Sequence, residues 1–396
     1  MKNQSVLISG ASIAGPALAY WLNRAGYRTT VVERAPALRQ GGHAVDFRGP
    51  AHMGVLEKMG LLDPIRSMQT HASDLAIVDA AGRRLVTLPA KFMAGEVEIQ
   101  RGDLSRILFD ETRDATEYVF GDHATSLVEH ADGVEVTFAQ GAPRRFDLVV
   151  GADGLHSGVR ALAFGDESRF IRFHGHYVAC FNGPNLLGVE SASRLYSEPG
   201  RAVSVGSARL RAEATTTFIF ASRPLDYRRH DVAQQKQIVS ERYAGMGWET
   251  PRLIDAMRGA SELYFDAISH VELPTYSRGR VVLLGDAGYG GTLGGQGTGL
   301  AIVCAYVLAG ELAAALGDHR AAFARYEATI RDYARGCQEG SERVGAFFAP
   351  PTRSRTWLRN TMYAALTSRP LAGLFEKLIT RSASSIDLPR YSLAQV

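Results

Sequence analysis

The stretch VLISGASIAG, residues 6–15, decides the fold of this chain. Its apolar first part predicts a buried strand, and its glycines at positions 10 and 15 predict a tight turn into a helix. Apolar residues then recur at helical spacing as far as Gly26, and a second strand-like run, TTVV at residues 29–32, ends on Glu33. A strand, a glycine turn, a helix and a second strand that ends on an acid form the βαβ unit of a dinucleotide site.

The glycine turn has a physical reason to bind a pyrophosphate. It directs the unpaired N–H groups of a helix N-terminus at the phosphates, and the helix dipole stabilises negative charge there by about 0.3–1 kcal/mol. Glu33 is placed to accept hydrogen bonds from an adenosine ribose. Ser12 stands where the G-x-G-x-x-G pattern has its middle glycine, so an ordinary βαβ turn without a ligand is the alternative for this motif taken alone.

Two further strand-like runs end on glycine motifs. Residues 146–150, FDLVV, lead into Gly-Ala-Asp-Gly at 151–154, which places Asp153 at the carboxyl edge of a sheet, where open α/β sheets bind ligands. The alternative is that Asp153 caps the short helix that follows. Residues 280–284, RVVLL, lead into the segment 285–299, in which eight of fifteen residues are glycine.

The glycine-dense segment 285–299 predicts a loop that wraps a flat, bulky ligand with its main chain. An apolar helix is expected at 300–316, with Thr298 as its cap, and its N-terminus would stabilise negative charge on the edge of a ring. A mobile lid without a ligand is the alternative.

In the order in which they occur, the three motifs resemble those of the class A flavoprotein monooxygenases, the aromatic hydroxylases with the p-hydroxybenzoate hydroxylase fold. The resemblance covers most of residues 1–345 and is strongest to the smaller members that act on polycyclic antibiotics and other secondary metabolites. It implies an α/β (α+β) fold, in which a Rossmann-like FAD domain carries an inserted, mainly antiparallel β-sheet domain for the substrate and a C-terminal helical segment.

The resemblance implies FAD contacts residue by residue. Asp286 is expected to bind the ribityl hydroxyls of the flavin, residues 294–297 to lie beside the pyrimidine edge of its ring, and Arg101 to lie near the FAD linker. Asp153 is expected to support both FAD and the nicotinamide donor. The expected cofactor-binding residues are Gly10, Ser12, Ile13, Ala14, Gly15, Glu33, Arg34, Arg48, Arg101, Asp153, Gly285, Asp286, Gly295, Gln296 and Gly297.

The chain departs from the family pattern just after its Gly-Asp-Ala motif. Gly288-Tyr289 stands where Ala-His or Ala-Tyr is usual, and Thr292-Leu293 stands where a proline is expected. FAD binding is expected to survive these changes, because the carboxylate and the helix N-terminus remain. The family pattern therefore does not predict which side chains form the wall that faces the substrate, or how freely the flavin swings.

The resemblance also implies a chain of three parts, and hairpin and alternating patterns predict the strands of its second part. The expected bounds are 1–70, 96–170 and 272–345 for the discontinuous FAD domain, 71–95 and 171–271 for the substrate-binding sheet domain, and 346–396 for the C-terminal helical bridge.

Five aromatic residues of the sheet domain are candidates for an aromatic substrate pocket, although a place in the core of the sheet is the favoured interpretation. They are Tyr177, Phe181, Tyr196, Phe218 and Phe220. The histidines, His52 among them, are isolated in the sequence, and no catalytic base is assigned.

The function that the resemblance implies is an oxygenation. NAD(P)H would reduce FAD, the reduced flavin would take up O2 as a C4a-hydroperoxide, and one oxygen atom would pass to an aromatic or polyketide-like substrate. The donor would bind transiently, since the sequence has no second G-x-G-x-x-G unit. The alternatives are Baeyer–Villiger oxygenation of a polycyclic ketone by the same flavin peroxide, or a non-catalytic flavin-binding redox sensor.

Composition limits the partners. Lys and Arg number 44 against 41 for Asp and Glu, and this balance gives no concentrated basic field for nucleic acid. Three widely spaced cysteines favour a reducing compartment, and no spacing predicts a metal site. Without a signal-peptide pattern or a run of about 18 apolar residues, we expect a cytoplasmic monomer or homodimer with no membrane partner. The segment 357–380 is expected to bridge the domains, with a membrane surface as the alternative.

Overall fold

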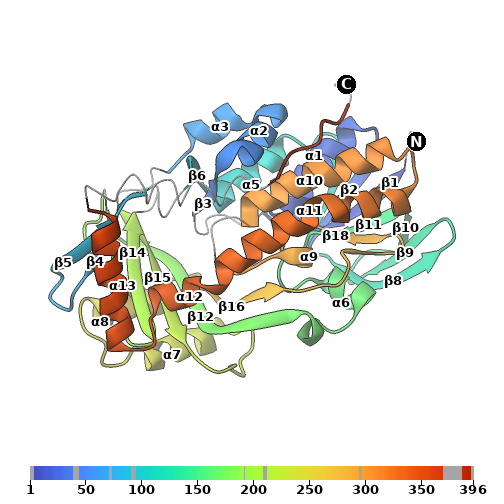
Figure 1. The fold of residues 1–396 in the computed structure, drawn as a ribbon. Coiled ribbons are helices and arrows are strands. Elements are labelled where there is room, and N and C mark those ends of the chain that lie inside the picture. The colour runs from blue at the N-terminus through green and yellow to red at the C-terminus, as the bar shows by residue number, and fades with distance from the viewer. Residues whose placement is uncertain are drawn as a thin grey trace.

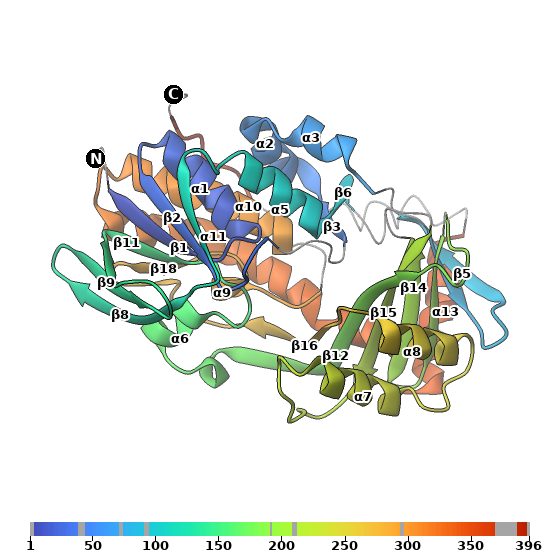
Figure 2. The same ribbon diagram turned by 180° about the vertical axis from the view of Figure 1, so that it is seen from behind.

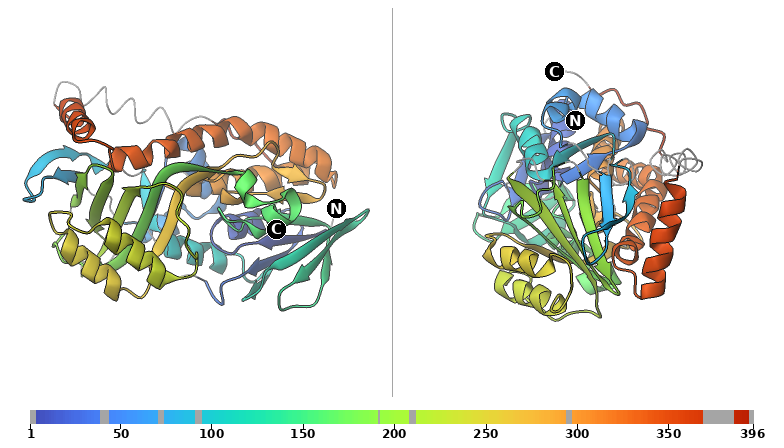
Figure 3. Two further views of the ribbon diagram at one scale, coloured as in Figure 1. Left: turned by 90° about the horizontal axis from the view of Figure 1, so that it is seen from below. Right: turned by 90° about the vertical axis from the view of Figure 1, so that its left-hand side faces the viewer.

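The structure is a computed structural model that describes residues 4–38, 44–70, 74–90, 95–190, 192–207, 212–293, 297–368 and 386–393. The molecule is elongated, with one large sheet in each half (Figures 1 and 3). A long strand, β12 (Ile171–Pro184), and a long helix, α11 (His319–Glu342), run from one half toward the other.

The first half is built on a six-stranded sheet with the order β17-β18-β11-β1-β2-β7. All neighbours are parallel except the short pair β17 and β18. Its central strands are buried on both faces, as their continuous apolar runs predict. The strands are β1 (Ser5–Ser9), β2 (Arg28–Glu33), β7 (Thr116–Phe120), β11 (Leu148–Gly151), β17 (Ser277–Arg278) and β18 (Val281–Leu283).

Helices cover one face of this sheet and a small antiparallel sheet covers the other (Figures 1 and 2). On the helical face, α10 (Gly297–Ala314) packs against both α1 (Ala14–Arg24) and α11. The small sheet has the order β10-β9-β8. Its strands are β8 (Ala124–His130), β9 (Gly133–Phe138) and β10 (Arg144–Phe146), and α6 (Gly158–Phe164) lies next to β8.

Among the described residues, α10 is the one helix long and apolar enough to cross a membrane. In this structure 78% of that helix is buried inside the molecule, where its neighbours include α1, α2 (Gly49–Met59) and α11. An apolar helix surrounded by other elements is typical of a protein core.

The second half is a seven-stranded sheet with the order β16-β12-β15-β14-β13-β4-β5, antiparallel except for the pair β13 and β4. The mainly antiparallel sheet expected from the sequence is confirmed, including the hairpin at 74–88. The strands besides β12 are β4 (Asp74–Val78), β5 (Arg84–Leu88), β13 (Ala192–Glu198), β14 (Arg201–Ser207), β15 (Glu213–Ala221) and β16 (Tyr264–Val271).

The two faces of this sheet pack against different helices. Side chains alternate across a strand, so Phe218 and Phe220 of β15 face α7 (Val232–Arg242) and α8 (Thr250–Gly259), while Ile219 faces the other way. All five aromatic residues proposed for a substrate pocket are buried in the core with α7 and α8, so their interpretation as core residues is confirmed.

The C-terminal part of the chain contacts both halves. Helices α12 (Val344–Phe348) and α13 (Arg353–Leu366) pack against the seven-stranded sheet. Residues 386–393 lie along α10, where the Tyr391 hydroxyl donates to Glu311 at 2.7 Å. Of the segment 357–380, the structure describes residues 357–368.

The remaining elements lie beside the first sheet. Strands β3 (Ala44–Phe47) and β6 (Val97–Gln100) form an antiparallel pair. The helices are α3 (Leu62–Ser67), α5 (Arg101–Asp110) and the short α9 (Asp286–Tyr289), and a 3-10 turn covers Glu167–Arg169.

Candidate functional site

The three glycine motifs meet at one edge of the six-stranded sheet. Strands β1, β11 and β18 are parallel neighbours, and their carboxyl ends lie side by side. The Ala152 N–H donates to the carbonyl of Ser9 at 2.8 Å, and the Leu284 N–H donates to the carbonyl of Gly151 at 2.8 Å. This is the edge at which open α/β sheets bind their ligands.

The first glycine turn is closed so tightly that side chains do not fit. Gly10 has φ of +111°, and a Cβ there would overlap the carbonyl of Ala152. A Cβ at Gly15 would overlap the carbonyl of Gly10. Both glycines are therefore needed to bring α1 against the strand ends, where its N-terminus is available to a phosphate.

Glu33 holds the glycine turn in place. Its Oε2 accepts from the Ala11 N–H and its Oε1 from the Ala35 N–H, both at 2.9 Å. A carboxylate has about four lone-pair sites, so further acceptor capacity remains for a ribose hydroxyl. Arg34 follows it at the exposed end of β2.

Ser12, the departure from the glycine pattern, contacts a predicted site residue 89 positions away. Its Oγ accepts from Arg101 Nη2 at 3.1 Å and from Arg101 Nε at 3.3 Å. Arg101 begins α5, and its charge also acts on Asp286. The hydroxyl at position 12 thus anchors a guanidinium beside the first motif, which a glycine would not do.

Asp286 lies beside the start of α10. A Cβ at Gly297 would stand 3.5 Å from its Oδ1. Burial raises the pKa of Asp286, and the charge of Arg101 opposes that rise. The preceding residue, Gly285, has little room for a side chain. Its φ is +64°, and a Cβ there would stand 3.2 Å from the Cβ of Ala14. Ala14 follows Ile13, the residue that precedes α1.

Asp153 supports a helix start but does not cap it. The cap of α6 is Ser157, whose Oγ accepts from the Arg160 N–H at 2.9 Å. Asp153 accepts from the Ser157 hydroxyl and from the Val159 N–H. The alternative interpretation of Asp153 as the cap was therefore wrong by four residues, and its carboxylate braces the true cap.

Arg160 ties the second motif to the third. Its side chain is fully buried, and its Nη1 donates to the carbonyl of Ala287 at 2.9 Å. Its Nη2 donates to the carbonyl of Leu155 at 2.7 Å. Within the described part of the chain, its Nε is a buried donor without a partner.

Arg48 joins the site through a buried histidine. The Arg48 N–H donates to His52 Nδ1 at 3.0 Å, and its guanidinium pairs with Asp46. The His52 ring lies where a Cβ at Gly299, in the first turn of α10, would be placed. Sequence reasoning named His52 only as one isolated histidine among several, because its partners lie far along the chain.

The residues that depart from the family pattern after the third motif lie in different surroundings. Tyr289 points into the core, where its hydroxyl lies 2.8 Å from that of Tyr326, so it does not face the substrate side. Leu293, with φ of +60°, packs with the apolar face of the seven-stranded sheet that includes Ile219 and Ile268. Thr298 was expected to cap α10, and this prediction was wrong, because Thr298 lies inside the first turn of that helix.

Twelve of the fifteen predicted residues surround this edge or connect to it through the bonds above, and Arg34 lies exposed beside it. Gly295 and Gln296 lie outside the described residues. Backbone N–H groups at a helix start, a buried carboxylate, an adjacent guanidinium and glycines too confined for a Cβ are the groups that FAD requires along its pyrophosphate and ribityl chain. The residues present fit this cofactor.

Comparisons with known proteins agree with that geometry. Residues 3–340 match the family described as "FAD binding domain". A flavin-dependent monooxygenase from an unknown prokaryotic organism is 38% identical over 394 residues, covering 98% of this chain and 99% of the relative. An uncharacterised protein of Mycobacterium tuberculosis is 42% identical over 339 residues, covering 83% and 90%. The solved structure of tetracycline destructase Tet(55) is 36% identical, with a TM-score of 0.83 over 99% of this chain and 100% of that one.

The matches extend over nearly the whole chain, and they confirm the fold class and the FAD cofactor expected from the three motifs. The chain therefore belongs to the class A flavoprotein monooxygenases, the FAD-dependent oxidoreductases of the FAD-binding-domain family.

Proposed function

We propose that this enzyme hydroxylates an aromatic or polyketide-like small molecule with NAD(P)H as electron donor. The balanced reaction is R–H + O2 + NAD(P)H + H⁺ → R–OH + NAD(P)⁺ + H2O. The observation that carries the proposal is the position of Asp286, which is buried beside the start of α10 and is influenced by the charge of Arg101, at the edge where the three motifs meet.

The substrate would lie between the glycine loop and the apolar face of the seven-stranded sheet. Leu293 of the loop belongs to the same apolar cluster as Leu195, Ile219 and Ile268 of the sheet. These sheet residues are 0–2% exposed, so the partly buried Leu293 is the apolar side chain that would face a bulky ring system. Tetracycline destructase Tet(55), to which this chain is similar, acts as its name says on a polycyclic antibiotic, and this supports the same substrate class here.

The chain's own residues bind and orient. The N-terminus of α1 and the anchored guanidinium of Arg101 would neutralise the pyrophosphate, and Asp286 would accept from ribityl hydroxyls. FAD, when bound and reduced, supplies the oxygen atom activated from O2. The apolar sheet face would exclude water from the substrate side.

The proposal extends to the domains, the remaining site residues and the state of the enzyme in the cell. The FAD domain would comprise residues 1–70, 96–170 and 272–345, the substrate domain residues 71–95 and 171–271, and the C-terminal bridge residues 346–396. The remaining expected site residues, Arg34, Gly295 and Gln296, would contact FAD. The enzyme would act in the cytoplasm as a monomer or homodimer.

The proposal is tested by incubating the FAD-loaded protein with NADPH or NADH, air and a panel of aromatic and polycyclic compounds. Mass spectrometry of the products distinguishes the candidates. A phenol one oxygen atom heavier than its substrate supports hydroxylation, and a lactone supports Baeyer–Villiger oxygenation. NAD(P)H consumption that no compound accelerates, without any product, would favour the flavin-binding sensor. The site assignment is overturned if Asp286→Ala binds FAD unchanged.

A further inference from the structure

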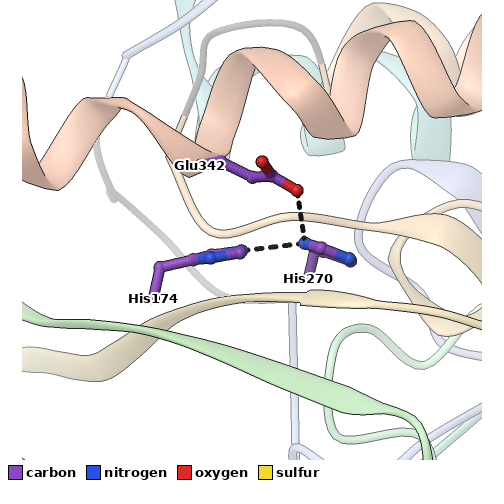
Figure 4. Close-up of side chains that lie close together, drawn as sticks. All are labelled: His174, His270 and Glu342. Atoms are coloured by element: carbon purple, nitrogen blue, oxygen red, sulfur yellow. Dashed lines mark hydrogen bonds and ion pairs between the residues drawn. The ribbon is translucent and has the colours of Figure 1, made fainter.

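Two histidines and a glutamate meet next to the first part of the glycine loop, to which one of the histidines is joined by a backbone bridge (Figure 4). His174 lies on β12, His270 on β16, and Glu342 is the last residue of α11. His174 Nε2 lies 2.8 Å from His270 Nδ1, which in turn lies 3.8 Å from Glu342 Oε1. All three potential ligand atoms lie within 4.8 Å of one another.

A bulge in the strand creates this meeting. The pairing of β12 with β16 shifts register between Phe173 and His176, so His174 and Gly175 bulge out of the ladder. Gly175 has φ of +72°, a conformation that favours glycine. Bulges re-aim side chains, and this one turns His174 toward His270 of the neighbouring strand.

We propose that His174, His270 and Glu342 bind a divalent transition-metal ion, with Zn²⁺ as the expected occupant. Two imidazole nitrogens and one carboxylate oxygen are ligands that zinc prefers, and three protein ligands leave a fourth position open for water. Zinc–nitrogen bonds of about 2.0–2.1 Å in a tetrahedron place two nitrogens roughly 3.3 Å apart. The two rings therefore need to separate by only about 0.5 Å as the ion displaces the proton between them.

The site is accessible to an ion from solvent, and a bound ion would stabilise the strands that hold the glycine loop. The Glu342 side chain is 47% exposed and that of His270 is 12% exposed, so the cluster opens to solvent on the glutamate side. His270 forms a backbone bridge with Gly291, and the Val271 N–H donates to the carbonyl of Gly290 at 2.9 Å. A bound ion would thus tie α11 to the strands that hold the glycine loop.

The experiment is calorimetric titration of the FAD-loaded enzyme with Zn²⁺ alone, repeated with Co²⁺ to record the absorption of a tetrahedral site. We expect one saturable equivalent. His174→Gln and His270→Gln should each weaken binding at least tenfold, and Glu342→Gln should weaken it less. The melting temperature of the wild type should rise on adding Zn²⁺, because a ligand that binds only the folded state stabilises it.

The matched control is His130→Gln, which removes an exposed histidine that lies 3.9 Å from Glu135 on another hairpin. It should bind Zn²⁺ like the wild type. Glu342 lies at an exposed helix end, so its variant reports on binding even if a histidine variant folds poorly. Binding that does not saturate, or that is equal in all folded variants, means adventitious surface binding only and overturns the proposal.

Discussion

The Nε2 atom of His52 lies 2.5 Å from the hydroxyl of Tyr333, in the interior between α2 and α11. Its Nδ1 accepts from the Arg48 N–H, so the ring proton is on Nε2 and is donated to Tyr333. The ring also fills the space beside Gly299. One neutral imidazole therefore joins the Arg48 segment, the first turn of α10 and α11.

We first predict that His52→Ala weakens both stability and FAD binding. The change leaves the Arg48 N–H without its buried acceptor and removes the bond to Tyr333, a loss of about 1–3 kcal/mol in the free energy of unfolding. His52→Asn keeps an acceptor on the Arg48 side and should recover part of the loss. Urea unfolding and quenching of FAD fluorescence measure the two effects, and unchanged FAD affinity in His52→Ala would contradict the link to α10.

The same histidine predicts a pH dependence. Burial, reinforced by the charge of Arg48, lowers the pKa of His52 to about 4 from 6.5. The unfolded state therefore binds the proton more tightly, and stability should fall as pH drops from about 6.5 to 4, by up to about 3 kcal/mol. Unfolding curves across this range test the sign. His52→Asn should lose this part of the acid sensitivity, and a slope equal to that of the wild type would refute the assignment.

Next, Gly299→Ala should be far more damaging than Gly54→Ala. Both glycines lie in helices, but a Cβ at Gly299 would overlap the His52 ring, whereas a Cβ at Gly54 meets nothing within 4 Å. Gly54→Ala should leave stability unchanged or raise it by about 0.5–1 kcal/mol, because alanine favours the helix. Gly299→Ala should lower the melting temperature and FAD content together. Equal behaviour of the pair would show that the ring moves aside freely.

How far the sequence predicts this site depends on the distance between partners. The strand ends at Gly10, Gly151 and Gly285 were predictable, because each motif combines an apolar run with local glycines. The contact between His52 and Tyr333 spans 281 positions, and a single histidine on an apolar helix carries no local signal of its partner. Tyr289 was equally ambiguous, since its direction depends on the packing of Tyr326.

His156 should make the free energy of unfolding depend on pH in the direction opposite to His52. Its burial lowers the pKa, but hydrogen bonds to Asp266 and Glu167 outweigh burial and raise it to about 9. The folded state holds the extra proton, so this stabilisation is present below about pH 6.5 and is lost as pH rises toward 9. Allowing for its 28% exposure, we expect a loss of up to about 2 kcal/mol. His156→Gln should flatten the profile of stability between pH 6.5 and 9, and a profile equal to that of the wild type would contradict this assignment.

The last prediction concerns Ser12, where two explanations give opposite results. If serine only substitutes for the middle glycine of the phosphate motif, Ser12→Gly should bind FAD as tightly as the wild type or more tightly. If its hydroxyl positions Arg101, both Ser12→Gly and Ser12→Ala lose a hydrogen bond to a charged group, and we expect FAD affinity to fall about tenfold. Fluorescence titration measures the affinities.

A double-mutant cycle with Arg101→Gln is the control. Once the guanidinium is gone, loss of the Ser12 hydroxyl should have no further effect on FAD affinity. The coupling energy between the two positions should then be at least about 0.5 kcal/mol, as for other residues in contact. Additive effects would mean that the contact does not position Arg101 for the cofactor.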